Sequence, residues 1–427
     1  DGKIVFFNEA EAVSDLEDSS TEEEPSIKRK KQAGKKEHDM SGLPITTIPH
    51  YMSEEELVDE FGLNGWKQLP DSITRRYIYI PAKIGVEEHH IGVYASKSDG
   101  HMVKAKHPKG LLHGSPVSAS IAAAIMNGKY VNAVPLYRQE KDWENLGISL
   151  SRATMANWVI RCTEDHLFPV MAHMQMELLS RDILHCDETP IQVLKEEGKK
   201  PQTKSYMWLY RTGGNTDNPI VLYEYQPSRG AKHPKEFLNS YKGYLHTDGY
   251  AGYHDLGEEI TVVGCWAHAR RKFDEAVKSL PKGKSKGSSA SQGLTYCNLL
   301  FGIEQEIADK TAEERYEERL KQAKPVLDAM FAWANSRTAA PKSALGKAFH
   351  YLKEQWPYLT NYLKDGRLEI SNNRAERSIK PFVIDRKNFL FANTPKGATC
   401  SAIMFSLIQT AIENGLDPYK YLTWLLK

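Results

Sequence analysis

Two short apolar segments, each running into an aspartate, constrain the fold of this chain more than any other feature. Residues 182–194 contain Asp187, and residues 243–250 contain Asp248. Short apolar runs bounded by Gly or Pro predict buried strands. A carboxylate there is costly to bury without a partner, and a hard divalent cation is one partner that satisfies its oxygens. The sequence therefore predicts two strands that bring acidic side chains to a metal site.

A third acidic residue belongs to a charged helix predicted within residues 367–391. Ser371 is a suitable N-cap for this helix, and Pro381 is expected to end it. Four polar residues follow helical spacing and would share one face: Asn373, Glu376, Arg377 and Lys380. A solvated surface helix shows the same pattern. What distinguishes Glu376 is the pair of acidic strands upstream, which it can reach only through the tertiary fold.

Four segments of the chain read HCDETPIQVL, LHTDGYAGYH, GCWAHARRKFDEA and SNNRAERSIKPFVIDRKNFLF. In this order and spacing they resemble the transposases of the insertion sequence 66 family, which are bacterial DDE transposases. The resemblance covers residues 114–427. It implies an RNase H-like catalytic domain whose catalytic and metal-binding triad is Asp187, Asp248 and Glu376. It also implies an enzyme that binds transposon ends, cleaves the DNA there and transfers the strands to target DNA.

The chemistry implied by the resemblance uses two Mg²⁺ ions, for which Mn²⁺ can substitute. Asp187 would bridge the ions, and Asp248 and Glu376 would each complete one site. Basic residues near the triad would hold DNA phosphates: Arg270, Arg271, Arg374, Arg377 and Lys380. Two rival carboxylates, Glu188 and Glu369, are ranked lower because they do not occupy the matching motif positions.

Composition fits a soluble globular protein, and the resemblance implies a bacterial protein of the cytoplasm, associated with the nucleoid when bound to DNA. No apolar run approaches the ~18 residues of a membrane span. The five cysteines are odd in number and widely spaced, which indicates reduced thiols. The net charge is only +1, so affinity for double-stranded DNA has to come from local basic patches. A homo-oligomer on DNA and accessory proteins from the same element are further expectations.

The predicted fold class is α/β, and the patterns of charge and hydrophobicity divide the chain into seven parts. The N-terminal parts are a disordered charged tail (1–45), a small β-rich module (46–113) with strands at 75–86, 91–94 and 102–106, and a helical region (114–180). The first part of the RNase H-like core (181–280) is followed by a linker and helical insertion (281–365), of which residues 281–293 are the linker. The last part of the core with Glu376 (366–400) and two C-terminal helices (401–427) complete the chain.

A helix-turn-helix is predicted in the helical region. Ser151 can cap its second helix, and the apolar positions keep i, i+3, i+4, i+7 spacing: Met155, Trp158, Val159 and Cys162. Polar residues early in that helix would contact DNA: Arg152, Thr154 and Asn157. An ordinary helical hairpin has the same pattern, and this alternative stays open.

Zinc is not expected. The region of the resembled family that matches residues 46–113 usually carries a zinc-binding module with paired cysteines, and this chain has no cysteine there. Further along, Cys265 and His268 supply two ligands where a structural zinc site uses four. Packing and hydrogen bonding are therefore favoured for this structural pair over a metal.

Two other functions remain open. An RNase H-like nuclease without strand transfer would use the same acids, although the helix-turn-helix and the insertion disfavour it. A catalytically inactive, transposase-derived DNA-binding protein is disfavoured by the three intact acids, although the missing cysteines favour it.

Overall fold

The computed structural model describes residues 45–427, apart from 74–75, 77–81, 215 and 282. The chain divides into two units, Asp1–Pro81 and Ala82–Lys427. In the first unit, the described residues form helix α2 (Glu54–Phe61), whose N-terminus is closed by a capping box between Ser53 and Glu56. The predicted tail, except for its last residue, lies outside the described residues.

The second unit begins with an antiparallel hairpin of β1 (Val93–Ala95) and β2 (Met102–Lys104). These confirm two of the three predicted strands, although both are shorter. Residues 82–86 of the third predicted strand have no regular structure, and most of its remainder lies outside the described residues. All six strand residues are exposed. The described part of this module therefore has less strand than predicted, because alternation alone does not hold a strand that has no apolar layer to pack on.

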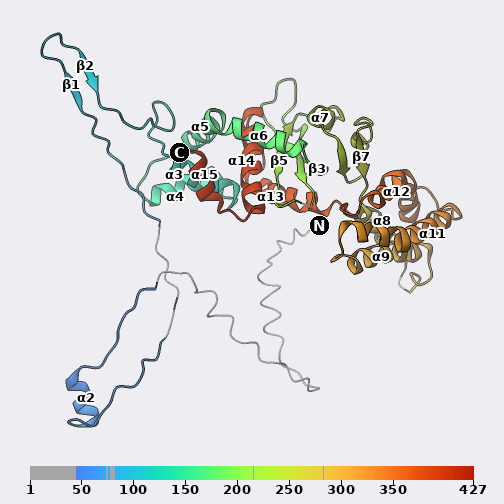
Figure 1. Ribbon diagram of the computed structural model, residues 1–427, viewed down its shortest axis with the longest axis horizontal. Helices are drawn as coiled ribbons and strands as arrows, with labels where there is room; N and C mark the ends of the chain where they lie inside the picture. The colour runs from blue at the N-terminus through green and yellow to red at the C-terminus, as the bar shows by residue number, and fades with distance from the viewer. Residues whose placement is uncertain (1–44, 74–75, 77–81, 215, 282) are drawn as a thin grey trace. The chain divides into compact units, whose positions relative to one another are not determined.

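A five-stranded mixed sheet with the order β5-β4-β3-β6-β7 forms the centre of this unit (Figure 1). The strands are β3 (Ile183–Gln192), β4 (Lys204–Thr212), β5 (Val221–Gln226), β6 (Gly243–His246) and β7 (Ile260–Val263). The first three form an antiparallel meander, and β6 and β7 run parallel to β3. Helix α7 (Lys232–Phe237) makes the crossover into β6, and a 3₁₀ turn (Ala251–Tyr253) precedes β7. The predicted mixed α/β class is confirmed.

The helices before the sheet share one hydrophobic cluster with it. They are α3 (Ala119–Tyr130), α4 (Leu136–Asn145), α5 (Arg152–Cys162) and α6 (Phe168–Leu179), with a π-helical turn (Thr163–Leu167) before α6. The predicted cap at Ser151 and the buried stripe of α5 are confirmed. Helix α3 continues past Gly128. A Cβ at Gly128 would lie 2.9 Å from Gln139 Nε2, so this glycine allows α4 to approach α3 closely.

The C-terminal helices α14 (Pro395–Glu413) and α15 (Pro418–Leu425) confirm the predicted pair. Helix α14 lies along the edge strand β5 (Figure 1). Ser406 Oγ accepts a hydrogen bond from Tyr223 N at 2.7 Å, and Thr410 Oγ1 accepts one from Val221 N at 2.9 Å. Hydroxyl groups of a helix therefore satisfy backbone donors that an uncovered sheet edge would leave open.

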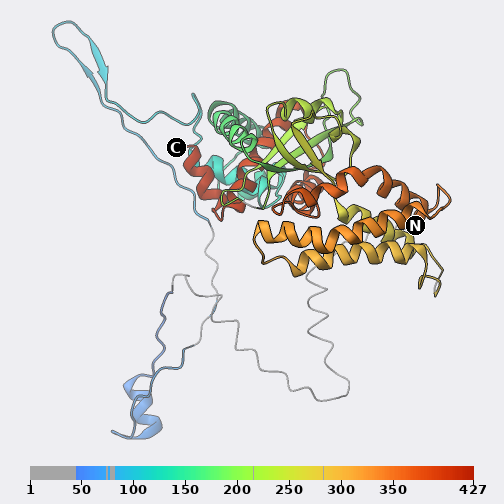
Figure 2. The same cartoon turned by 45° about the vertical axis from the view of Figure 1, so that its right-hand side comes forward.

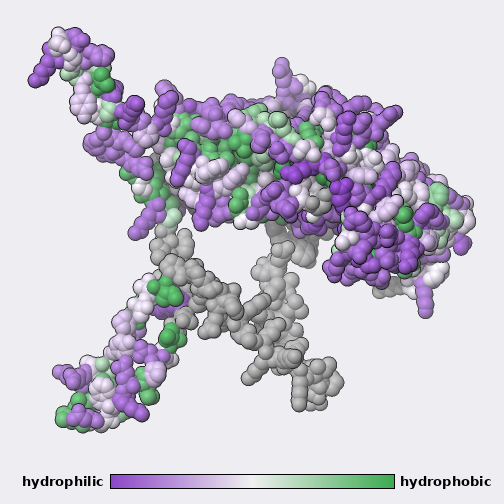
Figure 3. Space-filling model, in the orientation of Figure 1, coloured by the Kyte–Doolittle hydropathy of each residue, from purple (hydrophilic) through white to green (hydrophobic). Residues whose placement is uncertain are grey.

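A helical bundle follows β7 and packs around a second hydrophobic cluster. It contains α8 (Trp266–Lys278), α9 (Ser289–Glu306), α10 (Ala312–Glu318), α11 (Lys324–Asn335) and α12 (Ala344–Leu359). The helices run side by side in Figure 2, and their outer surface in Figure 3 is mostly hydrophilic. The predicted insertion is confirmed as helical. The predicted linker is shorter than expected, because Ser288 Oγ accepts from Ser291 N at 3.2 Å and starts α9.

Helix α13 (Asn373–Phe389) differs from its prediction at two points. Its N-cap position is Asn372 rather than the predicted Ser371, and Ser371 is buried. No side chain makes a capping hydrogen bond at this helix start. Pro381 lies inside the helix rather than at its end. The helix continues past the proline because its buried face extends through Phe382 and Asp385. In the part of the chain that the structure describes, no helix is long and apolar enough to span a membrane.

Candidate active site

Three acidic side chains from three elements line one pocket of about 300 Å³. Asp187 lies in the middle of β3, and Glu376 lies in the first turn of α13. Asp248 follows the end of β6 by two residues. In the parallel pairing of β3 with β6, His185 lies opposite His246, and each aspartate lies two residues further on. The structure therefore brings together the three acids that the sequence singled out.

The acids crowd negative charge into a half-buried space. Burial is the first cause that raises the pKa of Asp187 well above its usual range, and the charges of neighbouring acids add to it: Glu188, Asp248 and Glu376. Asp187 Oδ1 accepts from Glu188 N at 2.8 Å. Asp248 Oδ1 accepts from Tyr250 N at 2.9 Å. Backbone donors thus orient both aspartates, and their repulsion is what a divalent cation would relieve.

Two stacked histidines join the strands that carry the aspartates. The rings of His185 and His246 are parallel to within 8°, with centroids 4.2 Å apart, and both are fully buried. Burial lowers the pKa of His185 to about 3 and that of His246 well below its usual value. The stack therefore holds β3 against β6 without adding charge. Sequence reasoning missed it, although the repeated His-x-Asp spacing at 185–187 and 246–248 is a signal for it.

Asn372 links the three segments around the pocket. It is completely buried. Its Nδ2 donates to Cys186 O at 2.7 Å, and its Oδ1 lies 3.0 Å from His185 Nδ1. Its backbone N–H donates to Cys265 Sγ at 3.2 Å. The start of the helix that carries Glu376 is therefore fixed both to β3 and to the start of α8.

The helical insertion also contacts the acidic segments. Tyr351 of α12 donates from its hydroxyl to the backbone oxygen of Asp248 at 3.0 Å. The next residue, Gly249, has φ +93°, and a Cβ there would lie 2.9 Å from Gln355 Oε1 and 3.0 Å from Tyr351 Oη. Only glycine combines this backbone conformation with so close an approach. Helix α12 thus supports the turn that presents Asp248.

Side chains of α8 and α13 complete the pocket. His268 Nδ1 lies 3.7 Å from Glu376 Oε1, and Arg271 Nη2 lies 3.7 Å from Glu376 Oε2. Lys380 adds a second cation to the lining, which also includes two apolar residues, Ile379 and Val383. Of the predicted phosphate-binding residues, Arg271 and Lys380 therefore lie beside the acids. His268, predicted as part of a structural pair, also lines the pocket.

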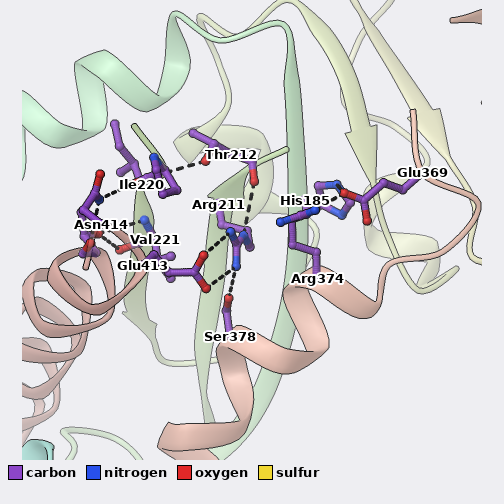
Figure 4. Close-up of polar contacts among 12 residues, drawn as sticks. His185, Arg211, Thr212, Ile220, Val221, Glu369, Arg374, Ser378, Glu413 and Asn414 are labelled. Atoms are coloured by element: carbon purple, nitrogen blue, oxygen red, sulfur yellow. Dashed lines mark hydrogen bonds and ion pairs between the residues drawn. The ribbon is translucent and has the colours of Figure 1, made fainter. Parts of the chain in front are cut away.

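The two rival carboxylates have cationic partners and do not line the pocket. Glu188 Oε1 accepts from Arg229 Nε at 2.7 Å, and Glu188 Oε2 accepts from Tyr253 OH at 2.6 Å. Glu369 Oε1 accepts from Arg374 Nε at 2.6 Å and lies 3.9 Å from His185 Nε2 (Figure 4). Both carboxylates therefore hold neighbouring segments in place.

The remaining predicted DNA contacts near the triad do not line the pocket. Arg270 Nε donates to Asn298 Oδ1 at 2.7 Å and so points to α9. Arg374 forms an ion pair with Glu369. Arg377 is exposed on α13, where it is free to meet a ligand larger than the pocket.

The helix-turn-helix candidate consists of α4, a turn and α5. Arg152 and Asn157 are exposed, whereas Thr154 is half-buried and its Oγ1 lies 2.9 Å from Ser151 Oγ. Gly147 in the turn has φ +87°. Arg152 and Asn157 are therefore better placed for a contact with DNA than Thr154, whose hydroxyl is engaged in the cap.

Comparison with known sequences gives a family match and three curated relatives. The profile described as "Transposase IS66 family" matches residues 114–400. The relatives are three uncharacterized proteins from Sinorhizobium fredii. Protein y4qI is 31% identical over 372 residues, which are 83% of this chain and 67% of the relative. Protein y4hP is 30% identical over 336 residues (74% of this chain, 60% of the relative), and y4jD is 29% identical over 366 residues (82% of this chain, 70% of the relative). The chain thus spans 60% to 70% of the length of these relatives.

The profile match includes each of the elements that line the pocket, from β3 with Asp187 to α13 with Glu376. It also includes α4, α5 and the helical insertion. The match therefore spans the whole of this region rather than one isolated motif. This chain belongs to the IS66 transposase family.

Proposed function

We propose that this chain is a DDE transposase that binds transposon ends in double-stranded DNA, cleaves the DNA there and joins the cleaved strands to target DNA. The observation that carries the proposal is the convergence of Asp187, Asp248 and Glu376 on one pocket. Membership of a transposase family supports DNA as the substrate. The crowded oxygens suit a hard cation better than any organic ligand of similar size.

We also propose that β3–β7 and α13 form an RNase H-like core. Three strands, a helix and two further strands follow one another along the chain. The connection from β6 to β7 contains a three-residue 3₁₀ turn (Ala251–Tyr253) rather than an α-helix.

The acids fit two Mg²⁺ or Mn²⁺ ions. All three acids line the same pocket, and the charges of Asp248 and Glu376 both act on Asp187. Asp187 would contact both ions, and Asp248 and Glu376 would each hold one. Bound ions would activate the attacking oxygen and stabilise the leaving 3′-oxygen.

Basic residues of the chain would position the DNA. Arg271 and Lys380 put positive charge on the pocket lining, where a phosphate would approach the acids, and Arg377 extends this charge along α13. The net charge of +1 leaves such local clusters as the source of affinity. Arg152 and Asn157 on α5 would contact the transposon end. Assembly as a homo-oligomer on DNA, with accessory proteins of the same element, is part of this proposal.

The test replaces each acid by its amide: Asp187→Asn, Asp248→Asn and Glu376→Gln. Each change keeps the side-chain size and removes the charge that holds the cation. Cleavage and joining of duplexes that carry the element's ends, measured with Mg²⁺, should each fall more than about a hundredfold, because even losing an outer-shell partner of a metal ligand costs ten- to a hundredfold.

The matched control is Asp385→Asn, which alters a buried acid on the same helix as Glu376 but outside the pocket. Its cleavage and joining should match the parent chain. Near-normal joining by any of the three amide variants would remove that residue from the triad. Cleavage without joining in the parent would favour the nuclease, and end binding without cleavage would favour the inactive DNA-binding protein.

A further inference from the structure

Three side chains of different chemistry converge at the pocket, and one of them is the proposed catalytic acid Glu376. Among the described residues, a thiol, an imidazole and a carboxylate from Cys265, His268 and Glu376 have ligand atoms that all lie within 4.8 Å of one another. Cys265 occupies the N-cap position of α8, and His268 lies one turn further on the same face. Glu376 approaches them from α13.

Two of these atoms are buried polar atoms that no hydrogen bond satisfies within the described residues. They are His268 Nδ1 and Glu376 Oε1, and they face each other at 3.7 Å. This separation is too long for a hydrogen bond. It is close to the ~3.4 Å between an imidazole nitrogen and a carboxylate oxygen that share a tetrahedral zinc ion, given Zn–N and Zn–O bonds of about 2.0–2.2 Å.

The thiol lies in a setting that suits a metal-bound thiolate. Cys265 is completely buried at the N-terminus of α8, where the helix dipole favours negative charge. Asn372 N donates to its Sγ at 3.2 Å. A bound cation would supply the missing charge compensation.

We propose that Cys265, His268 and Glu376 bind a thiophilic divalent cation of the Zn²⁺ class, with a fourth position open to water. Sulfur and nitrogen donors select such an ion over Mg²⁺. This departs from the packing role that the sequence favoured for Cys265 and His268, since the geometry adds the third ligand that their spacing lacked. The site shares Glu376 with the proposed catalytic site but uses Oε1, while Oε2 faces Arg271.

The test is a titration of the purified full-length chain with Co²⁺ alone, followed by Zn²⁺. Co²⁺ should bind one per chain, with a thiolate-to-cobalt charge-transfer band and the strong visible bands of tetrahedral Co²⁺, and Zn²⁺ should abolish both. Cys265→Ala should lose the charge-transfer band. Cys297→Ala, which removes another fully buried thiol, should keep it. Circular dichroism checks the fold of both variants.

A second variant keeps the proposal open to refutation if Cys265→Ala does not fold. His268→Ala alters a side chain that is 21% exposed, and it should weaken Co²⁺ binding more than about tenfold, as losses around metal ligands do. No charge-transfer band in the parent, a band that survives Cys265→Ala, or unchanged affinity in His268→Ala would each overturn the proposal.

The titration needs neither DNA nor cleavage, so it is independent of the proposed transposase activity. Asp248→Asn separates the two proposals, since this variant should lose Mg²⁺-dependent cleavage and keep the Co²⁺ bands. Loss of the bands in Asp248→Asn would place the bound ion at the catalytic acids instead and overturn the separate site.

Discussion

The residues around the pocket divide into those that present charge and those that fix its position. The acids themselves are held by backbone donors. Around them, the neutral stack of His185 and His246 and the buried amide of Asn372 connect the segments. A buried side-chain amide that makes two hydrogen bonds is costly to replace, because each partner is left unsatisfied.

Asn372→Ala should therefore lower the free energy of unfolding by about 1–3 kcal/mol and should reduce Mg²⁺-dependent cleavage further than the lost stability explains. The physical reason is that the helix that carries Glu376 starts from Asn372. Urea unfolding and cleavage, measured on the same preparation well below the unfolding midpoint, test this. Full cleavage activity in a destabilised variant would show that Asn372 serves stability alone.

Asp385 gives a prediction about pH. Burial raises its pKa from 3.8 to about 7, so the folded chain favours the protonated form. Its contribution to stability is present below about pH 4 and is lost as the pH rises through 7. Asp385→Asn should match the parent at pH 4 and should be more stable by about 1–3 kcal/mol at pH 8. A stability difference that does not change with pH, measured by urea unfolding, would contradict this.

At the scale of elements, the helical insertion is joined to the segment that leads into α13. Arg319 is completely buried at the junction of α10 and α11. It donates to the carbonyl oxygens of Tyr362, Asp365 and Leu368 at 2.7–3.0 Å, and to Glu304 at 2.6 Å. Together with Tyr351 on the Asp248 turn, this makes the insertion a support for both the second and the third acid.

Arg319→Met should destabilise the chain by about 3–5 kcal/mol, because it leaves three carbonyl groups without their donor and leaves Glu304 with the longer pair to Arg315. Lys324→Met is the matched control. It breaks an exposed pair with Asp328 four residues away, and such a pair is worth less than about 0.5 kcal/mol. Equal unfolding midpoints in urea for the two variants would mean that the insertion does not depend on Arg319.

At the scale of the molecule, the helices α3 and α5 share a hydrophobic cluster with the sheet and with α14. Leu112 already belongs to this cluster and is 1% exposed. Removing residues 1–110 should therefore leave the thermal unfolding of the rest unchanged. Removing residues 1–160 should abolish its cooperative transition, because it strips apolar contacts from α14. Calorimetry measures the thermal transitions of the two truncated chains. A cooperative transition in the chain without residues 1–160 would show that the sheet and α14 fold without α3 and α5.

The sequence predicted the strands of Asp187 and Asp248, the helical insertion and the three acids, because each depends on local periodicity or on a motif. It did not predict that α13 continues through Pro381, since the buried face of that helix depends on the sheet beneath it. It also missed His268 as a pocket residue and Asn372 as a link. Their contacts join residues more than 100 positions apart, and no local pattern records such a distance.

The position of α14 has a consequence for synthesis on the ribosome. The guanidinium of Arg211, on strand β4 next to the edge strand β5, is buried and forms a bidentate ion pair with Glu413 at the end of α14 (Figure 4). Translation delivers Asp187 and Asp248 well before the partner of Arg211 and the cover of β5. A growing chain therefore carries its first two acids in an incomplete sheet until α14 has been made.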